Sequence, residues 1–170
     1  MTILVLSDTH GREDRVERVL DMHKGVDMVL FLGDGLKDIR GREHDHRGGD
    51  FAAVSGNCDG FSISFTEKYP TEHLVRAGEY TILMMHGHTR GVKHGTSAAE
   101  EYAASIGADF LLYGHTHIAE ERYMPEGDMA GNIVLEKPLR VFNPGSLGYD
   151  SSYGLIQIRG KDILMSHGTV

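Results

Sequence analysis

The stretch Thr2-Ile3-Leu4-Val5-Leu6-Ser7-Asp8-Thr9-His10-Gly11 is an apolar run that ends abruptly in polar residues. A short apolar run bounded by turn residues is typical of a buried β-strand, so residues 2–7 are predicted to form one. In Asp8-Thr9-His10, the first and third side chains lie on the same side of an extended segment. Gly11 then lets the backbone turn sharply. The first strand therefore delivers a carboxylate and an imidazole to one point.

The same arrangement, an apolar strand followed by a glycine-containing loop with Asp, Asn or His, occurs four more times. The four are Met28 to Leu32 before Gly33-Asp34-Gly35, Phe51 to Val54 before Gly56-Asn57, Tyr80 to Met85 before His86-Gly87-His88, and Phe110 to Tyr113 before Gly114-His115-Thr116-His117. In open α/β sheets, ligands bind beyond the carboxyl ends of the strands. Five segments are thus predicted to bring metal-type ligands to one rim.

The remaining segments predict many strands and few helices. Helical spacing of apolar residues predicts a helix from Arg12 to Lys24, with Gly25 as its stop. Ser97 is expected to cap a second helix that runs to Ile106 and stops at Gly107. Further strands are expected at Ser62 to Phe65, His73 to Arg76, Arg140 to Phe142, Gly154 to Ile158 and Ile163 to Ser166, with a turn at Gly160-Lys161. The order of elements indicates parallel crossovers early in the chain and two mixed sheets face to face, with helices outside.

Composition limits the classes of function. The 170 residues fit one domain, 1–170, and 25 acidic against 17 basic side chains leave a net charge of −8. This balance argues against nucleic acid as a partner. No apolar run approaches the ~20 residues of a membrane span, and the start of the chain lacks the features of a signal peptide. Cys58 is the single cysteine, so no intrachain disulfide forms and a cytoplasmic location is expected.

The five polar loops together resemble the signature of the calcineurin-like metallophosphoesterase superfamily. In chain order, that signature is Asp-x-His, Gly-Asp, Gly-Asn, a single His and Gly-His-x-His, and here it extends from Asp8 to His117. The short length and the Gly-Asn-Cys-Asp variant are similar to its small bacterial and archaeal phosphodiesterase branch. The resemblance implies an α/β fold, a four-layer α/β/β/α sandwich of two mixed β-sheets flanked by helices. It also implies a hydrolase that acts on a small phosphodiester or phosphomonoester.

The resemblance further implies a ligand set for two divalent metal ions. Asp8, His10 and His117 would hold one ion, Asn57, His86 and His115 would hold the other, and Asp34 would bridge both. A water or hydroxide between the ions would attack the phosphate ester, because paired metals lower the pKa of that water and clamp the phosphoryl oxygens. Mn²⁺ is the expected metal, although Fe, Ni and Zn also suit imidazole and carboxylate ligands.

Two positions depart from the broader family pattern. Lys37 stands where the family often has the last Asp of Gly-Asp-x-x-Asp, and the following Asp38 is interpreted as a solvated loop residue without a role. Cys58 stands where the family has a His that protonates the leaving group, and a thiol is a weak replacement. Cys58 is either a reactive thiol or a small filler. His88 is counted with Asp34 and Asn57 among the catalytic candidates, although it could equally support a ligand or lie on the surface.

Other readings stay open. The same fold could serve as a non-catalytic protein-binding module, but such a module would be expected to lose metal ligands. A mononuclear metal hydrolase is a third possibility. His44-Asp45-His46 is interpreted as a solvated loop, and Asn143-Pro144-Gly145-Ser146 as a tight turn beside the pocket. A homodimer is the expected assembly, since two-fold dimers are the commonest closed oligomers.

Overall fold

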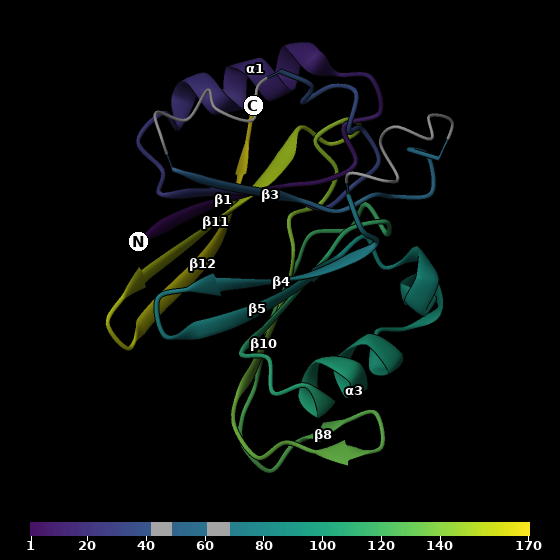
Figure 1. Cartoon of the computed structure of the whole chain (residues 1–170), viewed down its shortest axis with the longest axis vertical. Coiled ribbons are helices and arrows are strands. Elements are labelled where there is room, and N and C mark those ends of the chain that lie inside the picture. The colour runs from purple at the N-terminus through teal and green to yellow at the C-terminus, as the bar shows by residue number, and fades with distance from the viewer. Residues whose placement is uncertain (42–48, 61–68) are drawn as a thin grey trace.

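The computed structural model describes residues 1–41, 49–60 and 69–170, and all structural statements concern these residues. Two five-stranded sheets lie face to face, with a helix on the outer side of each (Figure 1). Both sheets contain parallel and antiparallel pairs. The predicted α/β sandwich of two mixed sheets is therefore confirmed. The strand expected at Ser62 to Phe65 and the loop at His44-Asp45-His46 lie outside the described residues.

The first sheet contains the early part of the chain and its end. Its order is β12-β11-β1-β2-β3, and β1, β2 and β3 run parallel to one another. The predicted parallel pairing is thus confirmed, and helix α1 connects β1 to β2. The elements are β1 (Thr2–Leu6), α1 (Glu13–Met22), β2 (Met28–Phe31), β3 (Asp50–Ala53), β11 (Ser152–Arg159) and β12 (Asp162–Thr169).

The second sheet has the order β4-β5-β6-β10-β7, with β5, β6 and β10 parallel at its centre. A two-stranded β8-β9 sheet and helix α3 complete this half. Strands β7, β8 and β9 were not predicted, because they are short or polar and lack a continuous apolar run. The elements are β4 (Glu72–Ala77), β5 (Tyr80–Met85), η1 (His88–Arg90), η2 (Val92–His94), α3 (Ser97–Ser105), β6 (Phe110–Tyr113), β7 (Glu120–Met124), β8 (Met129–Ala130), β9 (Ile133–Val134) and β10 (Leu139–Asn143).

The alternation of side chains along the strands explains the layers. In β1, Ile3 and Val5 face the second sheet, while Leu4 and Leu6 face α1. A strand that is buried on both faces needs apolar residues throughout, which is why its sequence reads as an unbroken apolar run. A third apolar cluster lies between the second sheet and α3. The strand ends of both sheets are therefore held rigidly by three packed layers of side chains.

Helix boundaries differ slightly from the predicted ones. Helix α1 ends at Met22 rather than Lys24, because the N–H of His23 already closes the last turn on Leu20 and Val19. The prediction that Ser97 caps α3 is wrong by one residue: Ser97 is the first helical residue and Thr96 precedes it. The Thr96 hydroxyl donates to the Glu100 carboxylate instead of accepting a backbone N–H.

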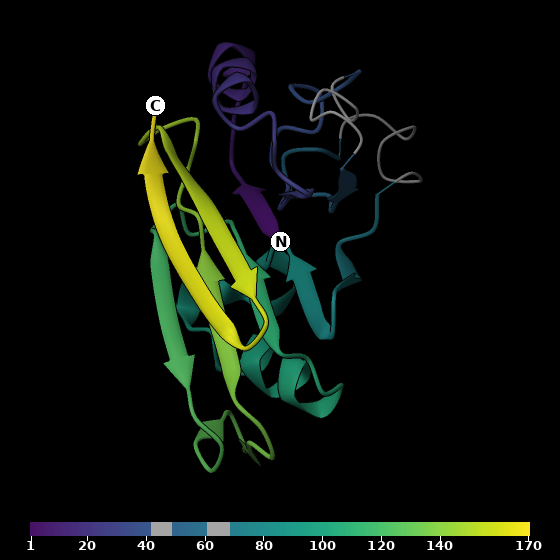
Figure 2. The same ribbon diagram turned by 90° about the vertical axis from the view of Figure 1, so that its left-hand side faces the viewer.

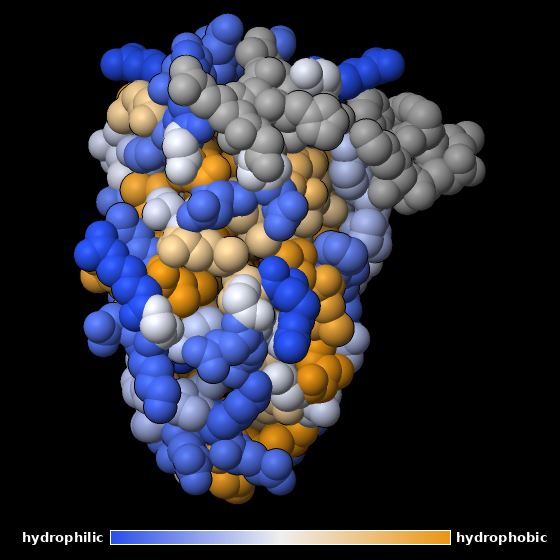
Figure 3. Space-filling model, turned by 60° about the vertical axis from the view of Figure 1, so that its left-hand side comes forward, coloured by the Kyte–Doolittle hydropathy of each residue, from blue (hydrophilic) through white to orange (hydrophobic). Residues whose placement is uncertain are grey.

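The turn at Gly160-Lys161 joins β11 and β12 as predicted, and Figure 2 shows this hairpin along one side of the molecule. On the face shown in Figure 3, hydrophilic and hydrophobic residues are mixed. Among the described residues, no helix combines the length and the apolar character that crossing a membrane requires.

Candidate metal centre

The predicted ligands lie on loops that follow β1, β2, β3, β5 and β6. Six non-glycine residues among the described ones have a left-handed backbone with positive φ, and five of the six are predicted ligands. L-residues rarely adopt this conformation, which persists only where the surroundings enforce it. The five are Asp8 (φ 54°), His10 (46°), Asp34 (58°), His115 (68°) and His117 (62°). The sharp turns thus aim the ligand side chains at one place.

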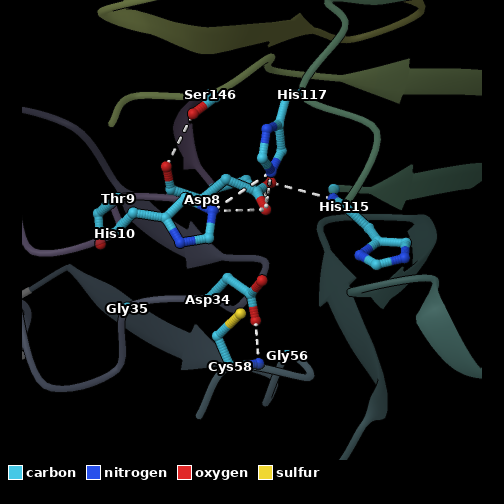
Figure 4. Close-up of polar contacts among 12 residues, drawn as sticks. Asp8, Thr9, His10, Asp34, Gly35, Gly56, Cys58, His115, His117 and Ser146 are labelled. Atoms are coloured by element: carbon cyan, nitrogen blue, oxygen red, sulfur yellow. Dashed lines mark hydrogen bonds and ion pairs between the residues drawn. The ribbon is translucent and has the colours of Figure 1, made fainter. Parts of the chain in front are cut away.

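The first ligand group is Asp8, His10 and His117 (Figure 4). The Nε2 atoms of the two histidines are 3.2 Å apart, and His117 Nε2 lies 3.2 Å from Asp8 Oδ1. Ligand bonds of about 2.0–2.2 Å place neighbouring donor atoms roughly 3–3.5 Å apart around one ion. Two of the three spacings fall in this range and the third, from His10 Nε2 to Asp8 Oδ1, is 3.8 Å, so the three atoms surround a space of about the size of a single cation.

The two carboxylate oxygens of Asp8 have different surroundings. Oδ2 accepts hydrogen bonds from the Ser7 hydroxyl at 2.5 Å and from the His115 N–H at 3.0 Å. Oδ1 is fully buried and has no hydrogen-bond partner among the described residues. A buried carboxylate oxygen without a partner is costly, so this atom is suited to bind a cation.

The second group is Asp34, His86 and His115, whose ligand atoms lie within 4.8 Å of one another. The fully buried His86 donates from Nδ1 to the Leu32 carbonyl at 2.7 Å. Since a carbonyl only accepts, Nε2 carries the lone pair of the neutral ring. Nε2 lies 3.4 Å from Asp34 Oδ2 and is also a buried atom without a hydrogen bond. His86 is therefore presented as a ligand in the required tautomer.

Asp34 lies between the two groups. Its ligand oxygen is within 4.8 Å of donor atoms of His86 and His115, and the carboxylate is equally close to His10 and Cys58. Oδ1 accepts the Cys58 N–H at 2.7 Å. Burial opposes ionisation of Asp34, but His86 and the Cys58 N–H hold its pKa well below the usual value. Asp34 is therefore an ionised carboxylate that lies close to donor atoms of several of the predicted ligands.

The two histidines of the second group have opposite pKa shifts. Burial lowers the pKa of His115 to about 4, and the neighbouring His86 adds to this effect. For His86, burial also disfavours the charged form, but Asp34 and Asp8 outweigh it and raise the pKa. Without a cation, the negative charges of Asp34 and Asp8 thus favour the protonated form of His86.

Asn57 and His88 are the remaining predicted residues. Asn57 is exposed, and its amide contacts Cys58 Sγ at 3.3 Å, while the adjacent Cys58 N–H fixes this loop on Asp34. The half-buried His88 ring lies 5.3 Å from the His86 ring and 6.1 Å from the His115 ring. Its Nδ1 atom has no partner among the described residues. Six of the seven predicted ligands thus lie in the two groups, whereas the described contact of the Asn57 side chain is to Cys58.

Asp59 is a structural residue of the site that sequence reasoning missed. Its carboxylate accepts the N–H groups of Asp34 and Gly56 at 2.8 Å, and those of Gly35 and Leu36 at 2.9 Å. One side chain therefore joins the loop after β2 to the loop after β3. The available signal was an Asp within a glycine-rich loop, since carboxylates often accept clustered backbone N–H groups.

The interpretation of Asp38 as a solvated loop residue is wrong. Asp38 is buried, and its Oδ2 accepts the Thr9 hydroxyl at 2.5 Å and the Gly11 N–H at 2.8 Å. It thereby fixes the Asp8-Thr9-His10 loop from the loop after β2. A single sequence could not show this contact, because it joins residues 29 positions apart.

Two further features close the site. A Cβ atom on Gly33 would lie 2.6 Å from the Gly56 nitrogen, so the loops after β2 and β3 can approach only through glycine. The Asn143–Ser146 turn lies beside the centre as predicted: Ser146 Oγ donates to the Asp8 carbonyl at 2.9 Å and Asn143 donates to the Gly114 carbonyl at 3.2 Å. The turn therefore contacts both the loop after β1 and the loop after β6.

A cleft of about 570 Å³ borders the His115–His117 loop. Its walls are partly apolar, and Lys93 is the cation among the residues that line it. Glu120, the anion of the cleft, accepts the Tyr113 hydroxyl and pairs with Arg122 at 3.0 Å. The lining residues are Val92, Lys93, Gly95, Tyr113, Thr116, Ile118, Ala119 and Glu120.

Comparison with solved structures includes two neighbours that share the fold at low identity. One is described as a novel archaeal phosphodiesterase (23% identity, TM-score 0.69, 98% of this chain and 99% of that chain). The other is vacuolar protein sorting 29 from Cryptosporidium parvum (18% identity, TM-score 0.67, 99% and 98%). At these identities the likeness concerns the fold alone.

Two further proteins are more similar to this chain in sequence. A predicted phosphoesterase from Streptococcus pneumoniae is 26% identical, with a TM-score of 0.76 over 99% of this chain and 88% of that one. A probable metallophosphoesterase of Bacillus subtilis, YsnB, is 32% identical over 86% of this chain and 75% of its own. The family profile of the calcineurin-like phosphoesterase superfamily domain matches residues 1–161. The chain therefore belongs to the calcineurin-like phosphoesterase superfamily, a family of metal-dependent phosphoesterases.

Proposed function

We propose that residues 1–170 form one metallophosphoesterase domain that hydrolyses a small phosphodiester with the help of two divalent metal ions, in the first place Mn²⁺. One observation carries the proposal. Asp8 Oδ1 and His86 Nε2 are fully buried, lie 4.0 Å apart and have no hydrogen-bond partner in the described part of the chain. An anionic oxygen and an imidazole lone pair at such a distance are satisfied together by cations.

The assignment of ligands follows the two groups. Asp8, His10 and His117 would hold one ion, Asn57, His86 and His115 the other, and Asp34 would bridge them. Such a pair of ions supplies an activated water at neutral pH and stabilises the charge that develops on the phosphoryl oxygens. The chain contributes the orientation of the ligands: Leu32 selects the tautomer of His86, and Asp59 fixes the backbone of Asp34.

The protonation state of the remaining groups favours particular substrates. Burial lowers the pKa of His88, and the neighbouring His86 lowers it further, so the protonated ring that could donate a proton is less populated near neutral pH than for an ordinary histidine. Burial and Asp34 raise the pKa of the Cys58 thiol to about 11. Neither group is a strong proton donor for a departing alkoxide. We therefore expect diesters with a good leaving group, such as aryl esters, to react faster than alkyl esters.

The cleft beside His115 offers space for an ester arm, and Lys93 on its wall suits an anionic substrate. The net charge of −8 still disfavours long nucleic acids. A cytoplasmic location and a homodimer complete the proposal.

Metal analysis of the purified protein, combined with a screen of phosphomonoesters and phosphodiesters with added Mn²⁺, tests this function. We expect about two bound ions per chain and turnover of aryl diesters. Fewer than one ion per chain, together with no turnover under any divalent ion, would contradict the proposal and favour a binding module on the same fold. One ion per chain with full activity would favour a mononuclear hydrolase.

A further inference from the structure

Tyr149 lies against the candidate metal centre without being part of the predicted ligand set. Its ring is stacked on the His117 ring, with centroids 5.0 Å apart and planes at 24°, and it lies 5.1 Å from the His10 ring. Nevertheless 64% of the residue is exposed. Tyr149 therefore covers the edge of one ligand group and still offers aromatic surface to whatever enters the site.

The backbone that carries Tyr149 is fixed on the ligand loop. Gly148 N–H donates to the Asp8 carbonyl at 2.9 Å, and Tyr149 N–H donates to Ser146 Oγ at 3.0 Å. From α1, the Arg15 guanidinium donates to the carbonyls of Leu147 at 2.8 Å and Gly148 at 2.7 Å. Gly148 passes so close to the first ligand loop that a Cβ atom would lie 2.5 Å from the Thr9 carbonyl oxygen. The position of Tyr149 relative to the ligands is thus determined by the fold.

A rigidly placed aromatic ring beside a binding site has a physical consequence. Aromatic faces attract other planar rings by offset stacking, and preorganisation reduces the entropy lost on binding. Exposure of a large ring also leaves apolar surface in water, which a stacked partner would cover. These properties favour a ligand whose phosphate meets the metal centre and whose attached group is planar.

We propose that Tyr149 stacks on a planar aromatic arm of the phosphoester and thereby selects aromatic over alkyl esters. The proposal rests on the proposed function, since it needs phosphate binding at the centre. The competing role is purely structural: the Tyr149 ring would hold the rings of His10 and His117 in place and would not contact a ligand. The two roles differ in their consequences. Support predicts a loss of bound metal when the ring is removed, whereas stacking predicts a loss of preference between ligands that differ in the arm.

The experiment measures equilibrium binding to the Mn²⁺-loaded protein by calorimetry, with two matched pairs of ligands. Phenylphosphonate and methylphosphonate differ only in a ring directly attached to phosphorus. Thymidine 5′-phosphate and 2-deoxyribose 5-phosphate differ only in a base one sugar away, so the pairs distinguish an aryl arm from a nucleoside arm. Where a ligand is turned over, its KM replaces the dissociation constant. The variants are Tyr149→Leu, which keeps apolar volume, and Tyr149→Phe, which keeps the ring.

The wild type is expected to favour the aromatic member of at least one pair by about five-fold or more, as base stacking on aromatic side chains does elsewhere. Tyr149→Leu should reduce this ratio to near one, with unchanged Mn²⁺ content, and Tyr149→Phe should retain it. The control is Tyr123→Leu, a tyrosine that is 55% exposed at the far end of β7. It should leave both ratios unchanged.

Two results would overturn the inference: equal ratios in wild type and Tyr149→Leu, or a loss of bound Mn²⁺ in that variant that Tyr149→Phe restores. The measurement does not require turnover. If the protein binds these ligands but hydrolyses no ester, the proposed catalytic function is wrong, but the binding ratios still test whether Tyr149 stacks on the ligand.

Discussion

The two sheets contribute different chemistry to the same site. The loops after β1, β2 and β3 of the first sheet carry the predicted oxygen ligands Asp8, Asp34 and Asn57, and of the predicted imidazole ligands this side carries His10. The loops after β5 and β6 of the second sheet carry the imidazoles of His86, His115 and His117. The first sheet therefore concentrates negative charge, and the second supplies neutral ligands.

This difference is matched by how the two sides are held. Loops of the first sheet are fixed by additional carboxylates, Asp38 and Asp59, which accept several N–H groups. On the second sheet, neutral groups take this role: the Leu32 carbonyl orients His86, and the Asn143 amide donates to the Gly114 carbonyl. The two sides thus differ in the charge of the groups that fix them. The following predictions test this division of roles, in order of decreasing effect.

The largest effect is expected for Asp34→Ala. Removal of the carboxylate that lies between both ligand groups should reduce kcat/KM for an aryl diester by about 10³-fold or more, since metal stabilisation contributes several kcal/mol to the transition state. The circular dichroism spectrum should stay that of the wild type. The control Asp162→Ala removes an exposed carboxylate at the start of β12 and should keep full activity. Substantial turnover by Asp34→Ala would contradict the bridging assignment.

A second, smaller effect is expected for Asp59→Asn. An amide cannot accept four N–H groups, so the loop backbone at Asp34 should loosen and metal affinity should fall by roughly 10–100-fold, as for other groups that orient ligands. The melting temperature should also decrease by several degrees. Isothermal titration with Mn²⁺ measures the affinity.

The matched variant is Asp109→Asn, directly before β6 of the second sheet. Asp109 accepts the Thr81 N–H at 2.8 Å and pairs with Lys137, away from the site. This variant should lower stability without changing Mn²⁺ affinity. Equal losses of affinity in both variants would show that Asp59 acts only through global stability.

The imidazole side should govern the pH dependence of the metal-free protein. The pKa of His115 is lowered from 6.5 to about 4, so the unfolded chain binds more protons in this window. The free energy of unfolding should therefore decrease as pH falls from 6.5 towards 4. His115→Asn should flatten this part of the profile, measured by urea denaturation in the presence of a chelator. An unchanged slope would refute the contribution of His115.

His86 should act in the opposite sense. Its pKa is raised, so the stabilisation it provides is fully present below the ordinary value of 6.5 and is lost as pH rises through the raised pKa. In the same denaturation series, His86→Asn should remove the decline in stability above pH 6.5. If the decline persists in that variant, another group is responsible.

The smallest effect is expected for Cys58→Ser. The thiol is exposed, but its pKa of about 11 keeps it protonated near neutrality. The substitution should change kcat/KM by no more than about two-fold, because side chains that neither ligate nor transfer protons contribute little. Alkylation of the wild type by iodoacetamide at pH 8 should be slower than that of a free cysteine. Rapid alkylation with loss of activity would instead favour a reactive thiol.

Sequence reasoning succeeded where the information is local. Each ligand loop follows an apolar run and contains glycine, so its position at a strand end could be predicted from neighbouring residues. It failed for Asp38, which was taken as solvated, and for Asp59, which was not considered. Both act through hydrogen bonds to another loop, and no local pattern distinguishes such an Asp from an exposed one. Strand β7 was missed for the same reason, since its polar sequence gains its partner only from β10.

The sequence by itself determined which residues stand at the strand ends and which chemistry they carry, because apolar periodicity and glycine act over a few residues. The tertiary structure alone decided which of them meet. It brings His117 Nε2 within 3.2 Å of Asp8 Oδ1 across 109 positions of the chain, leaves Asn57 exposed and places Tyr149 against the ligands. Such juxtapositions follow from the packing of two sheets face to face, a long-range balance of burial and hydrogen bonding that no short segment contains.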